Sequence, residues 1–136
     1  MKIEIRYFSK GGNTKKLAEA IGEELGLKAM PISERIIEDI DVLFLCNSLY
    51  AFTVASPVKD FIRTCDKEIK TIYNVSSAGI MESTYKTVKK LCSKNNLNLS
   101  DKEFHCRGSY IHNKPKSHPD EKDLAAVKKF AQEVMK

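Results

Sequence analysis

The chain has 136 residues, carries a formal net charge of +5 and contains four cysteines but no tryptophan. This length is sufficient for one buried core, so we expect a single domain over residues 1–136. No apolar run is long enough to cross a membrane, and the charged first strand does not resemble a signal peptide. The sequence therefore predicts a cytoplasmic protein without a membrane segment.

The cysteines at positions 46, 65, 92 and 106 are scattered, with no Cys-x-x-Cys pair and no histidine at metal-ligand spacing. This arrangement favours free thiols over disulfides or a zinc site. The positive charge is uneven, because residues 69–136 carry 13 Lys and Arg against 7 Asp and Glu.

A turn rich in hydroxyl groups and glycine, Tyr7 to Thr14, joins an extended run (Lys2 to Phe8) to a helical pattern (Lys15 to Leu25). Such a turn can point backbone N–H groups and hydroxyls at an anion beside the positive end of a helix dipole. A tight strand-to-helix loop capped by Asn13 or Thr14 is the simpler alternative. The spacing excludes a P-loop and a Rossmann fingerprint, and a low-molecular-weight phosphatase would need a cysteine here.

The pattern around this turn resembles the flavodoxin family, in which the first loop wraps the phosphate of FMN. The matching residues are Ile5, Tyr7, Ser9, Gly12, Thr14, Ala18 and Ile21. Arg6 departs from the family pattern, which has an apolar or aromatic residue there. The resemblance implies a flavodoxin-like order of parallel strands, 2-1-3-4-5.

The next strands are predicted at Leu27 to Ile32 and at Asp41 to Asn47, and only Ser33 to Ile40 connects them. Eight residues cannot hold a full crossover helix with its loops. We therefore expect this helix to be short or missing. Its loss would also explain why charged residues alternate along the first strand, whose uncovered face would be solvated or used for self-contact.

Aromatic residues follow the third strand in the predicted loop Ser48 to Ala55, before a helix over Pro57 to Cys65. The loop could form a hydrophobic plug, or its aromatic rings could form one wall of a flavin site. The family resemblance assigns the stacking role to Tyr50, with Phe52 second.

The remaining elements complete an alternating α/β pattern. The sequence predicts a fourth strand at Ile69 to Ser76, a lysine-rich helix at Thr84 to Asn95, a fifth strand at Glu103 to Ile111 and a last helix after Pro119. The fold class is therefore α/β, an open five-stranded parallel sheet with helices on both faces. The fifth strand lacks the insertion of long-chain flavodoxins, which implies the short-chain type.

The resemblance implies that FMN binds across the carboxyl ends of strands one, three and four. The implied cofactor-binding residues are Ser9, Lys10, Gly11, Gly12, Asn13, Thr14, Asn47, Ser48, Leu49, Tyr50, Ala51, Phe52, Ser77, Ala78 and Gly79. No catalytic residue and no metal site is predicted.

The expected function is electron transfer between redox partners, which include acidic proteins that dock on the lysine-rich C-terminal half. An FMN-dependent NAD(P)H:quinone-type reductase and a flavin-free interaction module are the alternatives. Nucleic-acid binding is not expected, because no RNA-binding pattern accompanies the lysines. A monomer is favoured over a homodimer.

Overall fold

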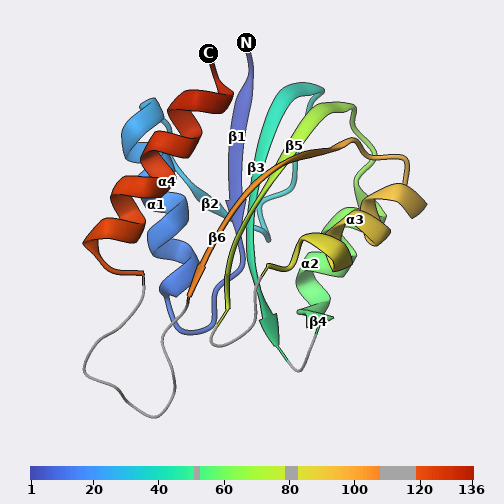
Figure 1. The fold of residues 1–136 in the computed structure, drawn as a ribbon. Helices are drawn as coiled ribbons and strands as arrows, with labels where there is room; N and C mark the ends of the chain where they lie inside the picture. The colour runs from blue at the N-terminus through green and yellow to red at the C-terminus, as the bar shows by residue number, and fades with distance from the viewer. Residues whose placement is uncertain (51–52, 79–82, 108–118) are drawn as a thin grey trace.

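The computed structural model describes residues 1–50, 53–78, 83–107 and 119–136, with the backbone alone for residues 49, 50, 78 and 107. Strands and helices alternate along the chain (Figure 1). The strands are β1 (Ile3–Tyr7), β2 (Met30–Pro31), β3 (Ile40–Tyr50), β4 (Thr53–Val54), β5 (Ile69–Ala78) and β6 (Leu99–Arg107). The helices are α1 (Asn13–Leu25), α2 (Ser56–Thr64), α3 (Tyr85–Lys94) and α4 (Glu121–Val134).

Five strands form a parallel sheet in the order β2-β1-β3-β5-β6. The short strand β4 pairs antiparallel with the end of β3 and lies off this path. Counted along the chain without β4, the parallel strands have the order 2-1-3-4-5. The predicted fold class and strand order are confirmed.

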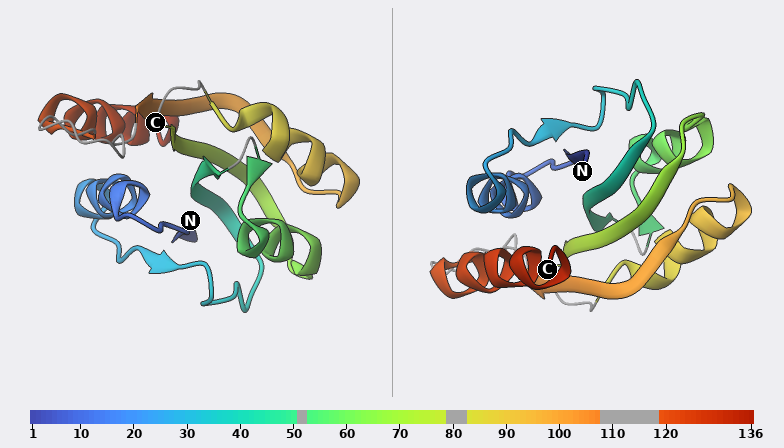
Figure 2. Two further views of the ribbon diagram at one scale, coloured as in Figure 1. Left: turned by 90° about the horizontal axis from the view of Figure 1, so that it is seen from below. Right: turned by 90° about the horizontal axis from the view of Figure 1, so that it is seen from above.

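Helices cover both faces of the sheet, with α1 and α4 on one side and α2 and α3 on the other (Figures 1 and 2). The central strand β3 explains both layers, because its apolar residues alternate between two hydrophobic clusters. Leu43 and Leu45 pack toward α2 and α3, whereas Phe44 and Cys46 pack toward α1 and α4. A strand buried on both faces needs a continuous apolar run, as this sequence has.

The connection from β2 to β3 contains only turns and bends between residues 32 and 39, so the crossover helix is missing as predicted. The expectation of a solvated strand face is wrong at Arg6, which is only 6% exposed. Its guanidinium donates hydrogen bonds to Glu34 O (2.6 Å) and Arg35 O (3.4 Å), and it pairs with Glu4 (2.7 Å). Arg6 therefore holds the connection against β1 in the absence of a helix.

Several predicted boundaries shift. Strand β3 continues to Tyr50 and pairs with β4, so the expected Ser48 to Ala55 loop is partly a β-hairpin. Strand β6 begins at Leu99 instead of Glu103, and α2 begins at Ser56 with Ala55 at the N-cap position. The predicted end of the fifth strand beyond Arg107 lies outside the described residues.

Helix α4 begins as the sequence predicts, with acidic residues at its amino end. Asp120 and Asp123 form a capping box, in which each side chain accepts a hydrogen bond from the other residue's backbone N–H. None of the helices within the described ranges is long and apolar enough to span a membrane.

Candidate functional site

The loop between β1 and α1 lies at the carboxyl edge of the sheet (Figure 1). Gly12, at the N-cap position of α1, has a φ angle of 93° and supplies no side-chain cap. The Ser9 hydroxyl oxygen instead accepts a hydrogen bond from Gly12 N at 2.9 Å. The first turn of α1 contains no acidic residue and includes Lys15 and Lys16. This combination favours an anion at the helix N-terminus.

The space beside this loop is open. A Cβ atom added at Gly11 or Gly12 would meet no atom within 4 Å. The φ angle is positive at Gly12 but not at Gly11. Contacts within the described protein therefore do not explain the glycine at position 11, whereas close approach of a ligand to the backbone would.

Thr14 and Ser77 connect two predicted parts of the site. Their hydroxyl oxygens lie 3.1 Å apart, and the two residues are 1% and 2% exposed. Thr14 lies in the first turn of α1, and Ser77 lies near the carboxyl end of β5. The fold thus brings the first loop and the end of the fourth parallel strand together.

Asn47 belongs to a buried polar ring that sequence reasoning missed. Its amide donates to Asn74 Oδ1 (2.8 Å), Asn74 Nδ2 donates to Thr84 Oγ1 (2.9 Å), and Thr84 Oγ1 donates to Asn47 Oδ1 (2.5 Å). All three residues are 0% exposed. The predicted ligand Asn47 therefore uses its side-chain amide inside the protein, where it joins β3 and β5 to the start of α3. An Asn in the middle of the apolar run of β5 was the available signal.

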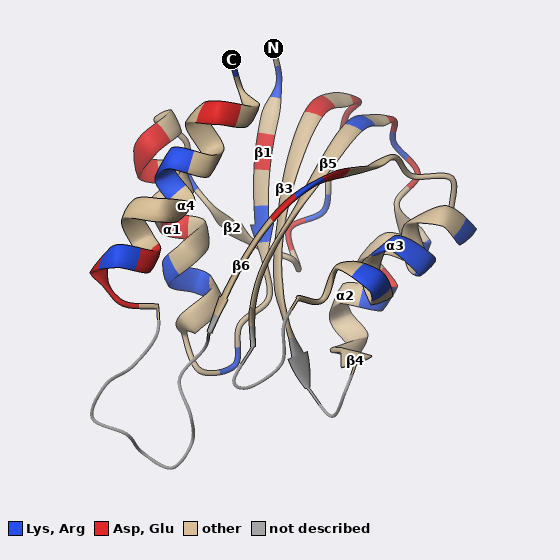
Figure 3. Ribbon diagram, viewed as in Figure 1, with Lys and Arg blue, Asp and Glu red and all other residues tan. Residues whose placement is uncertain are grey.

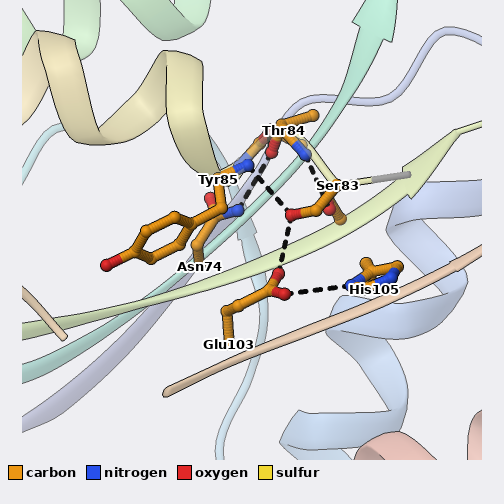
Figure 4. Close-up of polar contacts among 8 residues, drawn as sticks. Asn74, Ser83, Thr84, Tyr85, Glu103 and His105 are labelled. Atoms are coloured by element: carbon orange, nitrogen blue, oxygen red, sulfur yellow. Dashed lines mark hydrogen bonds and ion pairs between the residues drawn. The ribbon is translucent and has the colours of Figure 1, made fainter. Parts of the chain in front are cut away.

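A second polar chain reaches the edge strand β6 (Figure 4). Ser83 Oγ donates to Glu103 at 2.7 Å and accepts from Tyr85 N at 2.9 Å. Glu103 also lies 3.0 Å from His105 Nδ1. These contacts fix the position at which α3 begins, beside the carboxyl half of the sheet.

The remaining predicted ligands are only partly placed. Ser48 lies in β3 with 8% exposure, and Leu49 and Tyr50 are the last residues of the same strand. Ala78 ends β5. Ala51, Phe52 and Gly79 lie outside the described residues. The ring-stacking roles of Tyr50 and Phe52 stay predictions.

Burial raises the pKa of the Cys46 thiol, which lies directly before Asn47, far above its usual range. The thiol is therefore neutral at pH 7 and is a poor nucleophile. No group of three or more His, Cys, Asp or Glu that could bind a metal ion occurs in the described part of the chain.

Solved structures with this architecture include flavodoxins. A flavodoxin from the domain Archaea has a TM-score of 0.78 and 18% sequence identity, over 98% of this chain and 96% of that chain. A short-chain flavodoxin associated with a bacterial microcompartment has a TM-score of 0.72 and 16% identity, over 99% and 97%. The chain therefore has a flavodoxin-like fold of the short type.

The same fold also occurs as part of larger proteins. Rubredoxin oxygen:oxidoreductase from Desulfovibrio gigas has a TM-score of 0.73 and 14% identity, over 96% of this chain but 34% of that chain. No protein-family model and no curated protein sequence matches the chain.

Proposed function

We propose that the chain binds FMN non-covalently, with the phosphate in the loop from Ser9 to Thr14. The observation that carries this proposal is the amino end of α1, where a side-chain cap is absent and open space adjoins Gly11 and Gly12. The Ser9 hydroxyl accepts from Gly12 N and retains its own proton for a phosphate oxygen. The flavodoxin-like fold supports FMN as the ligand of this loop.

We infer from the family resemblance that Tyr50 stacks on the flavin ring, while residues 77 to 79 meet its polar edge. The contact between Thr14 and Ser77 supports this inference, because it joins the proposed phosphate loop to the strand end proposed for the ring. The fit is chemical as well: hydroxyl and backbone N–H donors suit a phosphate, and an aromatic side chain suits a flat apolar ring.

The proposed function is electron transfer between partner proteins in the cytoplasm. FMN supplies the redox chemistry when it is bound, and the protein contributes binding, orientation and exclusion of water. Electron transfer of this kind needs no general acid, general base or nucleophile. The neutral, buried thiol of Cys46 and the internally paired amide of Asn47 agree with a site that binds without catalysing a reaction on a substrate.

One absorbance titration tests the proposal. FMN added to the purified protein should bind at one site per chain with a shifted visible spectrum, and riboflavin should bind more weakly because it lacks the phosphate. Steady oxidation of NADPH by the loaded protein would favour a reductase. A protein that takes up no FMN would overturn the proposal and favour a flavin-free interaction module.

The partner proteins are proposed to be acidic and to dock beside α3. Exposed lysines form a row along this helix, visible in blue in Figure 3. The row consists of Lys86, Lys89, Lys90 and Lys94. Lys114 and Lys116, which the sequence also assigned to this surface, lie outside the described residues. A row of like charges attracts an acidic partner at long range.

Salt and charge reversal test the docking surface. The rate of electron transfer to an acidic acceptor protein should fall as salt rises through about 0.1 M, where the screening length is about 10 Å. Lys86→Glu with Lys90→Glu should slow the transfer at low salt. Lys122→Glu with Lys129→Glu on α4 makes the same change in net charge on another exposed surface. Equal slowing by both pairs would contradict docking at α3.

A further inference from the structure

A cavity of about 500 Å³ lies between the segment that follows β2 and helix α2, next to the end of β1. Figure 2 shows this segment running beside α2 on the same side of the sheet. A parallel crossover normally places a helix in this layer, and the short connection leaves the layer unfilled. The cavity is therefore a consequence of the missing helix.

The walls of the cavity are largely apolar and aromatic. Its lining residues are Tyr7, Phe8, Ser9, Pro31, Ile32, Ser33, Arg35, Pro57, Asp60, Phe61 and Thr64. The volume lies in the range of small-molecule sites, which are roughly 300–1,000 Å³, and such sites combine apolar walls with a few polar groups. The apolar walls favour a compact hydrophobic body, and the aromatic residues among them favour a planar one.

The charged groups at the cavity favour an anion. Arg35 donates to Thr64 O (2.7 Å) and Thr64 Oγ1 (3.2 Å), which fixes its guanidinium at the end of α2. Across the described residues, no carboxylate lies within 4.0 Å of Arg35. The other charged lining residue, Asp60, is paired with Arg63. A guanidinium keeps further N–H donors for a carboxylate.

The wall that carries Arg35 is held in place before any ligand binds. Ile32 N donates to Tyr7 O at 2.7 Å, and buried Arg6 donates to Glu34 O at 2.6 Å. With the bonds from Arg35 to Thr64, the segment is tied both to β1 and to α2. A preformed wall lowers the ordering cost of binding.

We propose that this cavity is a second binding site, for a small planar apolar molecule that bears a carboxylate or a similar anionic group. The aromatic and aliphatic walls take the apolar body, and Arg35 pairs with the anion. The site does not require flavin, although Ser9 lines this cavity and also belongs to the proposed phosphate loop.

Naphthalene-2-carboxylate and its neutral analogue 2-naphthylmethanol are suitable probes. The protein without added FMN is titrated with each, and binding is followed by calorimetry and by amide NMR shifts. The carboxylate should bind about fivefold more tightly than the alcohol, because one partly exposed ion pair distinguishes them. The shifts should concentrate in residues 7–9, 31–35 and 57–64.

Variants separate the contribution of the charge from that of the walls. Arg35→Gln should remove the preference for the carboxylate and leave the alcohol's affinity unchanged, whereas Arg35→Lys should keep part of the preference. Ser33→Trp, which enlarges an exposed lining residue, should weaken both probes. Lys59→Gln removes a positive charge of α2 that does not line the cavity and should change neither affinity.

Three results would overturn the proposal: neither probe binds, the two probes bind equally to the natural protein, or the NMR shifts lie outside residues 7–9, 31–35 and 57–64. Circular dichroism and the melting temperature of each variant confirm that it is folded. Repeating the probe titrations with FMN present tests this cavity independently of the proposed FMN site, because the cavity can bind its probes whether or not FMN binds.

Discussion

The hydroxyl oxygens of Thr14 and Ser77 lie 3.1 Å apart in a buried contact, although 63 positions separate the two residues along the chain. In such a pair one hydroxyl donates to the other, so one of the two protons is free for a third group. The contact ties the start of α1 to the end of β5. It gives the proposed phosphate loop a fixed position relative to the fourth parallel strand.

Replacement of Thr14 by Val removes one hydroxyl from this pair at nearly constant volume. FMN affinity should fall by roughly 1.5–3 kcal/mol, the scale of a hydrogen bond to a charged group. Riboflavin affinity should change much less, because riboflavin has no phosphate. Flavin fluorescence titrations measure both. Equal losses for the two flavins would mean that the loop does not bind the phosphate.

Gly11 and Gly22 allow a comparison between a glycine proposed to contact the ligand and a glycine packed against the protein itself. A Cβ at Gly11 meets no atom within 4 Å, whereas a Cβ at Gly22 would lie 2.4 Å from Leu27 O. Gly22→Ala should therefore lower the free energy of unfolding by about 1–3 kcal/mol, the usual cost of overpacking. Gly11→Ala should leave it nearly unchanged but weaken FMN binding. Urea unfolding and FMN titration of both variants check this, and a destabilised Gly11→Ala protein would contradict it.

The buried ring of Asn47, Asn74 and Thr84 should contribute strongly to stability. Thr84→Val leaves Asn47 Oδ1 and Asn74 Nδ2 without their partner in the ring. The expected loss in the free energy of unfolding is roughly 2–3 kcal/mol, because each buried group left unpaired costs about 1–3 kcal/mol. Thr87→Val, at a half-buried position of the same helix, is the control. A similar small loss for both would show that the ring relaxes or admits water.

The sequence predicted the structural features that depend on residue types with one main structural role. The glycines and hydroxyl residues after β1 predicted the first loop, and the apolar run of β3 predicted the central strand. The eight residues between the second and third predicted strands predicted the missing crossover helix. The sequence was less informative about contacts between distant segments. The extension of β3 to Tyr50 depends on pairing with β4, and the burial of Arg6 depends on carbonyl groups 28 and 29 positions away.

At the candidate site, too, the sequence was less informative about contacts between distant segments. The family resemblance assigned polar residues at the carboxyl ends of β3 and β5 to the flavin site. Whether an amide faces outward or inward depends on its partners, and the partners of Asn47 are an asparagine 27 positions later and a threonine 37 positions later. No local pattern encodes those contacts.

Two buried thiols and one half-buried thiol should make the protein lose stability in alkali. Burial raises the pKa of Cys92 to about 11 and that of Cys106 to about 12, from an ordinary value of 9.0, and it raises the pKa of Cys46 further. Above pH 9 the unfolded chain releases these protons while the folded chain retains them. The free energy of unfolding therefore falls as pH rises from about 9 toward 12. Urea unfolding between pH 8 and 11 should show this decline, and Cys92→Ala should make it shallower. A slope unchanged by Cys92→Ala would contradict the assignment.

The connection that replaces the crossover helix should depend on Arg6. Arg6→Met keeps the apolar stem but removes the donors to Glu34 O and Arg35 O, and it leaves the Glu4 carboxylate without this cation. Because Arg6 is buried, the expected loss is about 2–3 kcal/mol, within the range for hydrogen bonds made by charged groups. Hydrogen exchange of residues 32–39 should also become faster, since their attachment to β1 is weakened.

Lys2→Met is the matched control for Arg6→Met, because it removes a cation from the residue directly before the same strand. The Lys2–Glu38 pair is exposed, with 60% and 52% of the two side chains accessible, and such exposed pairs contribute little to stability. Urea unfolding and hydrogen exchange of the two variants should therefore differ clearly. The contrary result is that both variants lose equally little stability and that residues 32–39 exchange at the natural rate in each. In that case packing of Ile32 and Ile36 into the core holds the connection and Arg6 does not.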